Sequence, residues 1–90
     1  IPADYQFNAD LRYNKKGSDV RFLQIFLKAQ GAGIYPEGTI SGWFGPLTKK
    51  AVIKFQEKYR NEILAPWNLQ NGTGFVGQTT RAKINEMLGR

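Results

Sequence analysis

The sequence predicts an all-α fold, a compact three-helix bundle with two long loops rich in glycine and aromatic residues and an extended N-terminal arm. Apolar residues recur at steps of three and four in three segments, which is the period of an amphipathic helix. A glycine-bounded turn leads into two of these segments. All three are related by one offset of 32 residues, so we expect one structural unit to be used more than once.

The repeat is clearest around the two turns. Residues 42–49, Gly-Trp-Phe-Gly-Pro-Leu-Thr-Lys, align with residues 74–81, Gly-Phe-Val-Gly-Gln-Thr-Thr-Arg. The same offset places Gln24 over Gln56, each a polar residue on an otherwise apolar helical face. Such a residue is either a ligand contact or a buried amide that satisfies loop backbone groups, and we favour the structural role.

The chain begins with a segment that shows no sustained period. Residues 1–10 are interpreted as an arm or linker, and residues 11–89 as the folded domain. Tyr5, Phe7 and Leu11 are apolar enough to lie across a helical core, so we expect the last part of the arm to pack down.

The first helix is predicted over residues 18–30. Ser18 or Asp19 can cap its first N–H groups with a side-chain oxygen, and Gly31 can end it. The loop that follows, residues 31–45, is rich in glycine and aromatic residues.

The second and third helices are predicted over residues 46–62 and 78–88. Pro46 suits the first position of a helix, where its missing N–H costs nothing. The second loop, residues 65–77, joins them, and Gly89 ends the third helix.

The composition limits the chemistry that the chain can perform. A net charge of +6 favours acidic partners. The absence of histidine and cysteine removes the usual metal ligands and the usual general base and nucleophile. The seven carboxylates are scattered and share no motif. We therefore expect no enzyme, no metal and no cofactor.

No apolar run has the roughly 18 residues that a membrane helix needs, so we expect no membrane insertion. The chain begins at Ile1-Pro2, and we expect it to be a module of a longer protein.

Three motifs together resemble the peptidoglycan-binding domain of bacterial cell-wall hydrolases. They are Gly17-Ser18-Asp19-Val20-x-x-Leu23-Gln24-x-x-Leu27, then Thr39-Ile40-Ser41-Gly42-Trp43-Phe44-Gly45-Pro46-Leu47-Thr48-x-x-Ala51-Val52-x-x-Phe55-Gln56, then Gly74-Phe75-Val76-Gly77-x-x-Thr80-Arg81. The resemblance covers residues 11–89. It implies a non-catalytic, bacterial, extracytoplasmic module that binds the glycan strand and stem peptide of peptidoglycan. It also implies a covalently attached hydrolase or peptidase, which the module holds against the wall, and we expect a monomer.

Ligand contacts are predicted from loop aromatic residues and from groups near helix starts. Exposed rings in the loops can stack on sugar faces, and Trp43 is the best candidate. Basic side chains and hydroxyls near helix N-termini can hold the carboxylates of peptidoglycan. The predicted ligand-binding residues are Tyr35, Thr39, Ser41, Trp43, Thr48, Lys49, Trp67 and Arg81.

Two other functions remain open at this point. A small basic helical DNA-binding domain would suit the charge, but the loops are long and the basic residues are not concentrated on one helix. A pro-domain of a protease is the other alternative. A related helical fold forms the propeptide of matrix metallopeptidases, which inhibits through a cysteine, and this chain has none.

Overall fold

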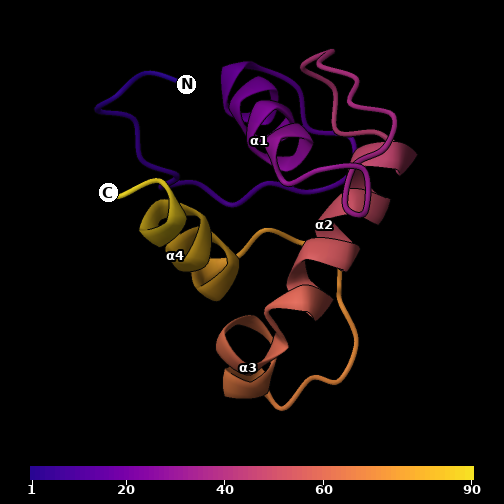
Figure 1. The fold of residues 1–90 in the computed structure, drawn as a ribbon, viewed down its shortest axis with the longest axis vertical. Coiled ribbons are helices and arrows are strands. Elements are labelled where there is room, and N and C mark those ends of the chain that lie inside the picture. Colours follow the sequence, from indigo (N-terminus) through magenta and orange to yellow (C-terminus); the bar gives the residue numbers. More distant parts are fainter.

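Helices are the only regular secondary structure elements in the computed structural model, which describes residues 1–90 (Figure 1). They are α1 (Ser18–Ala29), α2 (Pro46–Lys58), α3 (Arg60–Ile63) and α4 (Gln78–Met87), with a 3-10 turn, η1, at Ala65–Trp67. The predicted all-α bundle is confirmed. The helix ends at Ala29 and Met87 each lie one residue before the predicted ones.

The second helix is shorter than predicted, because it ends at Lys58 instead of residue 62. Tyr59 has φ −110° and ψ 41°, outside the helical region, and α3 begins after it. The Tyr59 ring packs on Phe55, 5.1 Å between centres, and the Lys83 ammonium lies 4.8 Å from its centre. Figure 1 shows α3 turned away from the end of α2, which moves the following chain to one side.

The predicted cap of α1 is wrong. The N-cap is Gly17, at φ 131°, and no side chain bonds to the first N–H groups. Ser18 is exposed, and the Asp19 carboxylate accepts a hydrogen bond from the Tyr5 hydroxyl instead. The carboxylate is therefore drawn toward the arm and away from the helix start.

Sixteen buried apolar residues form one core, drawn from the helices, the loops and the arm. Phe26 and Phe55 meet edge to face across α1 and α2, with ring centres 5.4 Å apart. Phe7 and Leu11 are fully enclosed. The expected packing of Phe7 and Leu11 against the core is confirmed, and the core of so short a chain needs these side chains.

The arm is also held by polar contacts with the C-terminal helix and the residues after it. The Asn85 amide donates to the Phe7 carbonyl and accepts from the Phe7 N–H, at 3.2 and 2.8 Å. The Arg90 guanidinium donates to the carbonyls of Tyr5 and Pro2, at 3.1 and 2.8 Å. Both chain ends consequently lie on the same side of the domain (Figure 1).

The two glycine-bounded turns, residues 42–45 and 74–77, are called elbow 1 and elbow 2 below. Gln24 of α1 organises elbow 1. Its Oε1 accepts from the N–H groups of Ser41 and Gly42, both at 2.9 Å. Its Nε2 donates to the Trp43 carbonyl at 2.9 Å and to the Thr48 hydroxyl at 3.1 Å.

Gln56 of α2 organises elbow 2 in the same way. Its Oε1 accepts from the N–H groups of Thr73 and Gly74, at 2.8 and 3.0 Å. Its Nε2 donates to the Phe75 carbonyl at 2.7 Å and to the Thr80 hydroxyl at 3.2 Å. Each partner lies 32 residues after its counterpart, so the predicted repeat and the structural role of both glutamines are confirmed.

Residues 11–16 cross from one elbow to the other. The N–H and carbonyl of Leu11 pair with those of Val76 at 3.1 and 2.8 Å. Further along, the Asn14 N–H donates to the Phe44 carbonyl at 2.7 Å, and the Phe44 N–H donates to the Lys15 carbonyl at 2.8 Å. This segment fixes the two elbows relative to each other.

Candidate functional site

A cleft of about 570 Å³ opens beside elbow 2. The arm, the ends of α2 and α3, η1, the second loop and the start of α4 all contribute to its lining. Three large exposed side chains, Trp67, Leu69 and Phe75, make it apolar, and Asp10 and Arg81 add charge. A largely apolar hollow with a few convergent polar groups is the usual form of a ligand site.

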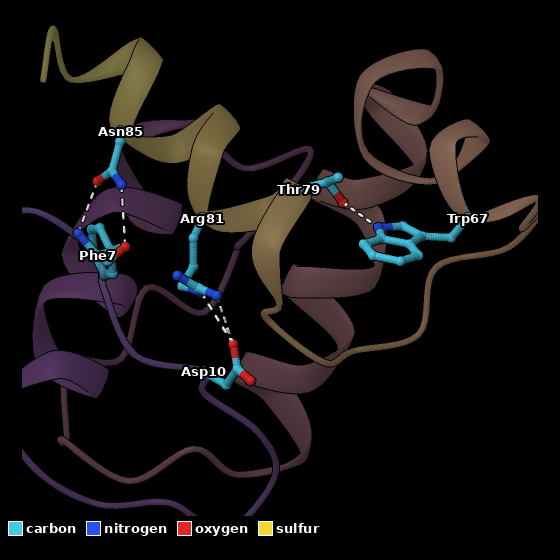
Figure 2. Close-up of polar contacts among 6 residues, drawn as sticks. All are labelled: Phe7, Asp10, Trp67, Thr79, Arg81 and Asn85. Atoms are coloured by element: carbon cyan, nitrogen blue, oxygen red, sulfur yellow. Dashed lines mark hydrogen bonds and ion pairs between the residues drawn. The ribbon is translucent and has the colours of Figure 1, made fainter.

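Trp67 is fixed in the cleft wall by its indole N–H. The N–H donates to the Thr79 hydroxyl at 3.0 Å, and that hydroxyl donates to the Ile63 carbonyl at 2.7 Å. Figure 2 shows the indole reaching from its own segment to Thr79 on the first turn of α4. The side chain stays 54% exposed, so the predicted exposure of this ring is confirmed. A ligand would meet a ring that is already oriented.

Phe75 lies over a glycine of its own elbow. A Cβ on Gly77 would stand 3.0 Å from the Phe75 ring. Elbow 1 repeats the arrangement, since a Cβ on Gly45 would stand 2.6 Å from the Trp43 ring. A side chain at position 45 would therefore force the Trp43 ring to move, and one at position 77 would crowd the Phe75 ring.

Arg81 and Asp10 form an ion pair in the cleft lining. The guanidinium Nε and Nη2 lie 3.1 and 3.0 Å from the Asp10 Oδ1 atom (Figure 2). The Arg81 side chain is 23% exposed and that of Asp10 is 52% exposed. The pair leaves the cleft nearly neutral and gives the arm one of its contacts with α4.

A second group of exposed aromatic residues lies at elbow 1. The Trp43 indole N–H donates to the Asn14 side-chain oxygen at 3.0 Å. The Tyr13 and Trp43 rings are 6.5 Å apart and tilted by 55°. The Lys49 ammonium lies 6.0 Å from the centre of the Tyr13 ring.

Two of the predicted site residues are buried. Tyr35 was expected to be an exposed loop aromatic, but it is 3% exposed and donates to the Thr39 carbonyl at 2.6 Å. The prediction of exposure is wrong because its ring is part of the buried core. The Thr48 hydroxyl is also enclosed, and its partners are Gln24 and Tyr35. It is occupied within the protein.

The predicted residues fall into two groups and do not converge on one site. Trp67 and Arg81 line the cleft. The other six, around elbow 1, are Tyr35, Thr39, Ser41, Trp43, Thr48 and Lys49. Among these six, the side chains of Thr39, Ser41, Trp43 and Lys49 are exposed.

Among the cleft residues that sequence reasoning missed are Phe75, Leu69, Thr79 and Asp10. Phe75 had a signal, because it is the repeat counterpart of Trp43. The others carried no local signal, since they meet only in the folded chain.

The chain has no histidine or cysteine, and its carboxylate side chains nowhere gather in threes close enough to hold a metal ion. No helix has both the length and the hydropathy needed to span a bilayer.

A family model of the peptidoglycan binding domain matches residues 16–62, just over half of the chain. The chain belongs to the peptidoglycan-binding domain family. The match includes α1, elbow 1 and α2, whereas most of the cleft wall follows residue 62 in the second copy of the repeat. Searches of curated proteins and of solved structures gave no match. The family resemblance predicted from the motifs is confirmed.

Proposed function

We propose that this peptidoglycan-binding domain binds the bacterial cell wall through the cleft beside elbow 2 and holds an attached hydrolase or peptidase against it. The observation that carries the proposal is the pair of exposed rings, Trp67 and Phe75, in one cleft. The Trp67 ring is held by its hydrogen bond to Thr79, so it loses little conformational freedom on binding, and the Phe75 ring lies against Gly77. Flat apolar rings suit the faces of sugar rings.

Charge supports the same ligand. The protein carries a net charge of +6, and peptidoglycan carries carboxylates on its stem peptides and muramic acid. Arg81 can exchange its Asp10 partner for a ligand carboxylate without leaving the cleft, because both groups are partly exposed.

The cleft supports binding and not catalysis. Asp10 is the only carboxylate that lines it. Glycoside hydrolysis in most families uses two carboxyl groups facing each other across the scissile bond. A binding module that leaves the chemistry to another domain agrees with this lining. The family supports an extracytoplasmic setting, because peptidoglycan is a cell-wall polymer.

Sedimentation with purified peptidoglycan sacculi tests the proposal. Trp67→Ala and Phe75→Ala should each weaken retention about tenfold or more, because each truncates an aromatic anchor. Met87→Ala, which shortens an exposed apolar side chain away from the cleft lining, is the matched control and should bind normally.

The proposal fails if the folded double variant Trp67→Ala/Phe75→Ala binds sacculi as the wild type does. It also fails if the domain does not bind sacculi and instead binds duplex DNA with an affinity that falls steeply as the salt concentration rises. Fusion to a fluorescent protein tests the anchoring role, since the wild-type fusion should coat exposed cell walls and the double variant should not.

A further inference from the structure

Elbow 1 presents an aromatic pair that takes no part in the cleft. Tyr13 is 51% exposed and Trp43 is 40% exposed, and their rings lie side by side. The Trp43 N–H already has its hydrogen bond to Asn14, so the indole is held in place. Large rings that are grouped, exposed and fixed mark an interaction surface more often than single exposed ones do.

Lys49 connects this pair to elbow 2. Its ammonium lies 6.0 Å from the centre of the Tyr13 ring. Its aliphatic stem passes over Gly74, where a Cβ would stand 2.8 Å from the Lys49 Cγ atom. Gly74 directly precedes Phe75 of the cleft. The exposed surface therefore runs from Trp43 through Tyr13 and Lys49 to elbow 2, and we call it the elbow strip.

The charge along the elbow strip differs from that of the cleft. Arg81 is paired with Asp10, whereas its repeat counterpart Lys49 forms no ion pair. The strip thus places one uncompensated cation between two aromatic groups. That arrangement suits a polymer in which apolar sugar faces alternate with acidic substituents.

The spacing also suits one extended ligand. Backbone bridges join Leu11 to elbow 2 and Lys16 to elbow 1. These two attachment points are five positions apart in the sequence, which limits the distance between them to about 18 Å even for a fully extended chain. A single strand can therefore reach both elbows.

We propose that elbow 1 is a second contact site for the same glycan strand, and that Lys49 meets an acidic group of the strand between the two sites. This inference rests on the proposed function of the cleft. A repeating polymer suits a repeated unit, and the residues that match the family include elbow 1. Two linked contacts make binding depend on the length of the glycan, because the second contact forms within one complex.

The test compares two ligands, intact sacculi and a soluble fragment that is one disaccharide with its stem peptide. Tyr13→Ala should weaken retention on sacculi by about tenfold or more and change the affinity for the fragment by less than about twofold. Lys49→Gln should weaken retention and reduce its dependence on salt. Lys58→Gln is the matched control. Lys58 lies on α2 as Lys49 does, its ammonium is beside the Tyr59 ring, and it forms no ion pair.

The outcomes separate the two proposals. Normal retention by Tyr13→Ala and Trp43→Ala together with defective retention by Trp67→Ala overturns the second site and leaves the cleft standing. An equal loss for sacculi and fragment also overturns it, because elbow 1 would then belong to one single site. Normal retention by Trp67→Ala and Phe75→Ala removes the function of the cleft, and this inference with it.

Discussion

Gln24 and Gln56 hold the two elbows through the same set of four hydrogen bonds, one glutamine on each of two successive helices. Both amides are 1% exposed. Each elbow contains a glycine at positive φ, Gly42 at 81° and Gly74 at 80°, where the backbone departs from the regular angles of a helix or strand. The buried amide supplies the missing partners at both places.

Replacing either glutamine with leucine should therefore destabilise the whole domain. Gln56→Leu nearly keeps the volume but removes the amide partners of the Thr73 and Gly74 N–H groups, the Phe75 carbonyl and the Thr80 hydroxyl. Each unsatisfied buried group costs about 1–3 kcal/mol, so we expect a loss of at least about 3 kcal/mol in urea unfolding. Gln70→Leu, on the exposed loop, should stay within about 0.5 kcal/mol of the wild type. Equal midpoints for the two variants would contradict this account.

Gly45→Ala should displace the Trp43 ring. The new Cβ would lie 2.6 Å from that ring, which must then move and give up its bond to Asn14. We expect a loss of about 1 kcal/mol and a changed tryptophan fluorescence spectrum. Gly33→Ala has no heavy atom within 4 Å of its Cβ and should be neutral or stabilising by up to about 1 kcal/mol. An unchanged spectrum for Gly45→Ala would show that the ring does not depend on this glycine.

Asp10→Asn should strengthen binding to sacculi while hardly changing stability. The ion pair with Arg81 is partly exposed, and such pairs contribute about 0–1 kcal/mol. The change removes a negative charge from the cleft and frees the guanidinium for a ligand carboxylate, so retention should increase and depend more on salt. Glu86→Gln, which also breaks an exposed ion pair but outside the cleft, should bind as the wild type does. Weaker retention by Asp10→Asn would argue that the pair serves to shape the cleft.

Tyr5→Phe should make the free energy of unfolding depend less on pH in the alkaline range. Burial and the hydrogen bond to the Asp19 carboxylate raise the pKa of the Tyr5 hydroxyl well above its ordinary value of 10.0. The folded state keeps this proton at a pH where the unfolded chain releases it. The contribution is therefore complete below about pH 10 and is lost as the pH rises from there.

Urea unfolding of wild type and variant at about pH 8 and about pH 11 measures this effect. The wild type should be more stable by about 1 kcal/mol at the lower pH, where the hydrogen bond is intact, and its advantage should shrink at the higher pH. Parallel losses for the two proteins would indicate that another group controls alkaline unfolding.

The features that sequence reasoning predicted correctly are local or repeated ones. Helical periodicity located the apolar faces of α1, α2 and α4, because the residues of each face lie only three or four positions apart in the sequence. The offset of 32 residues identified Gln24 and Gln56 as equivalent, and a polar residue on an apolar stripe at both places indicated a buried structural amide.

The features that it missed depend on distant contacts. The break at Tyr59 sits inside a favourable helical pattern and coincides with packing of its ring against Phe55 and Lys83. Tyr35 and Trp43 stand in the same glycine-rich loop, yet only Trp43 is exposed. Which of the two rings is buried depends on where the loop folds back onto the core, and the composition of the loop does not specify that.

Periodicity, the glycine turns and the 32-residue repeat were sufficient to determine the fold class and the two equivalent elbows of this chain, and the resemblance of its motifs to a known family indicated the family. The tertiary structure alone decided where a ligand could lie. The cleft needs Asp10 beside Arg81, 71 residues away in sequence, and Trp67 beside the first turn of α4. The physical reason is that a helix follows from interactions within a few residues, whereas a cleft is the space left between segments after the core has packed.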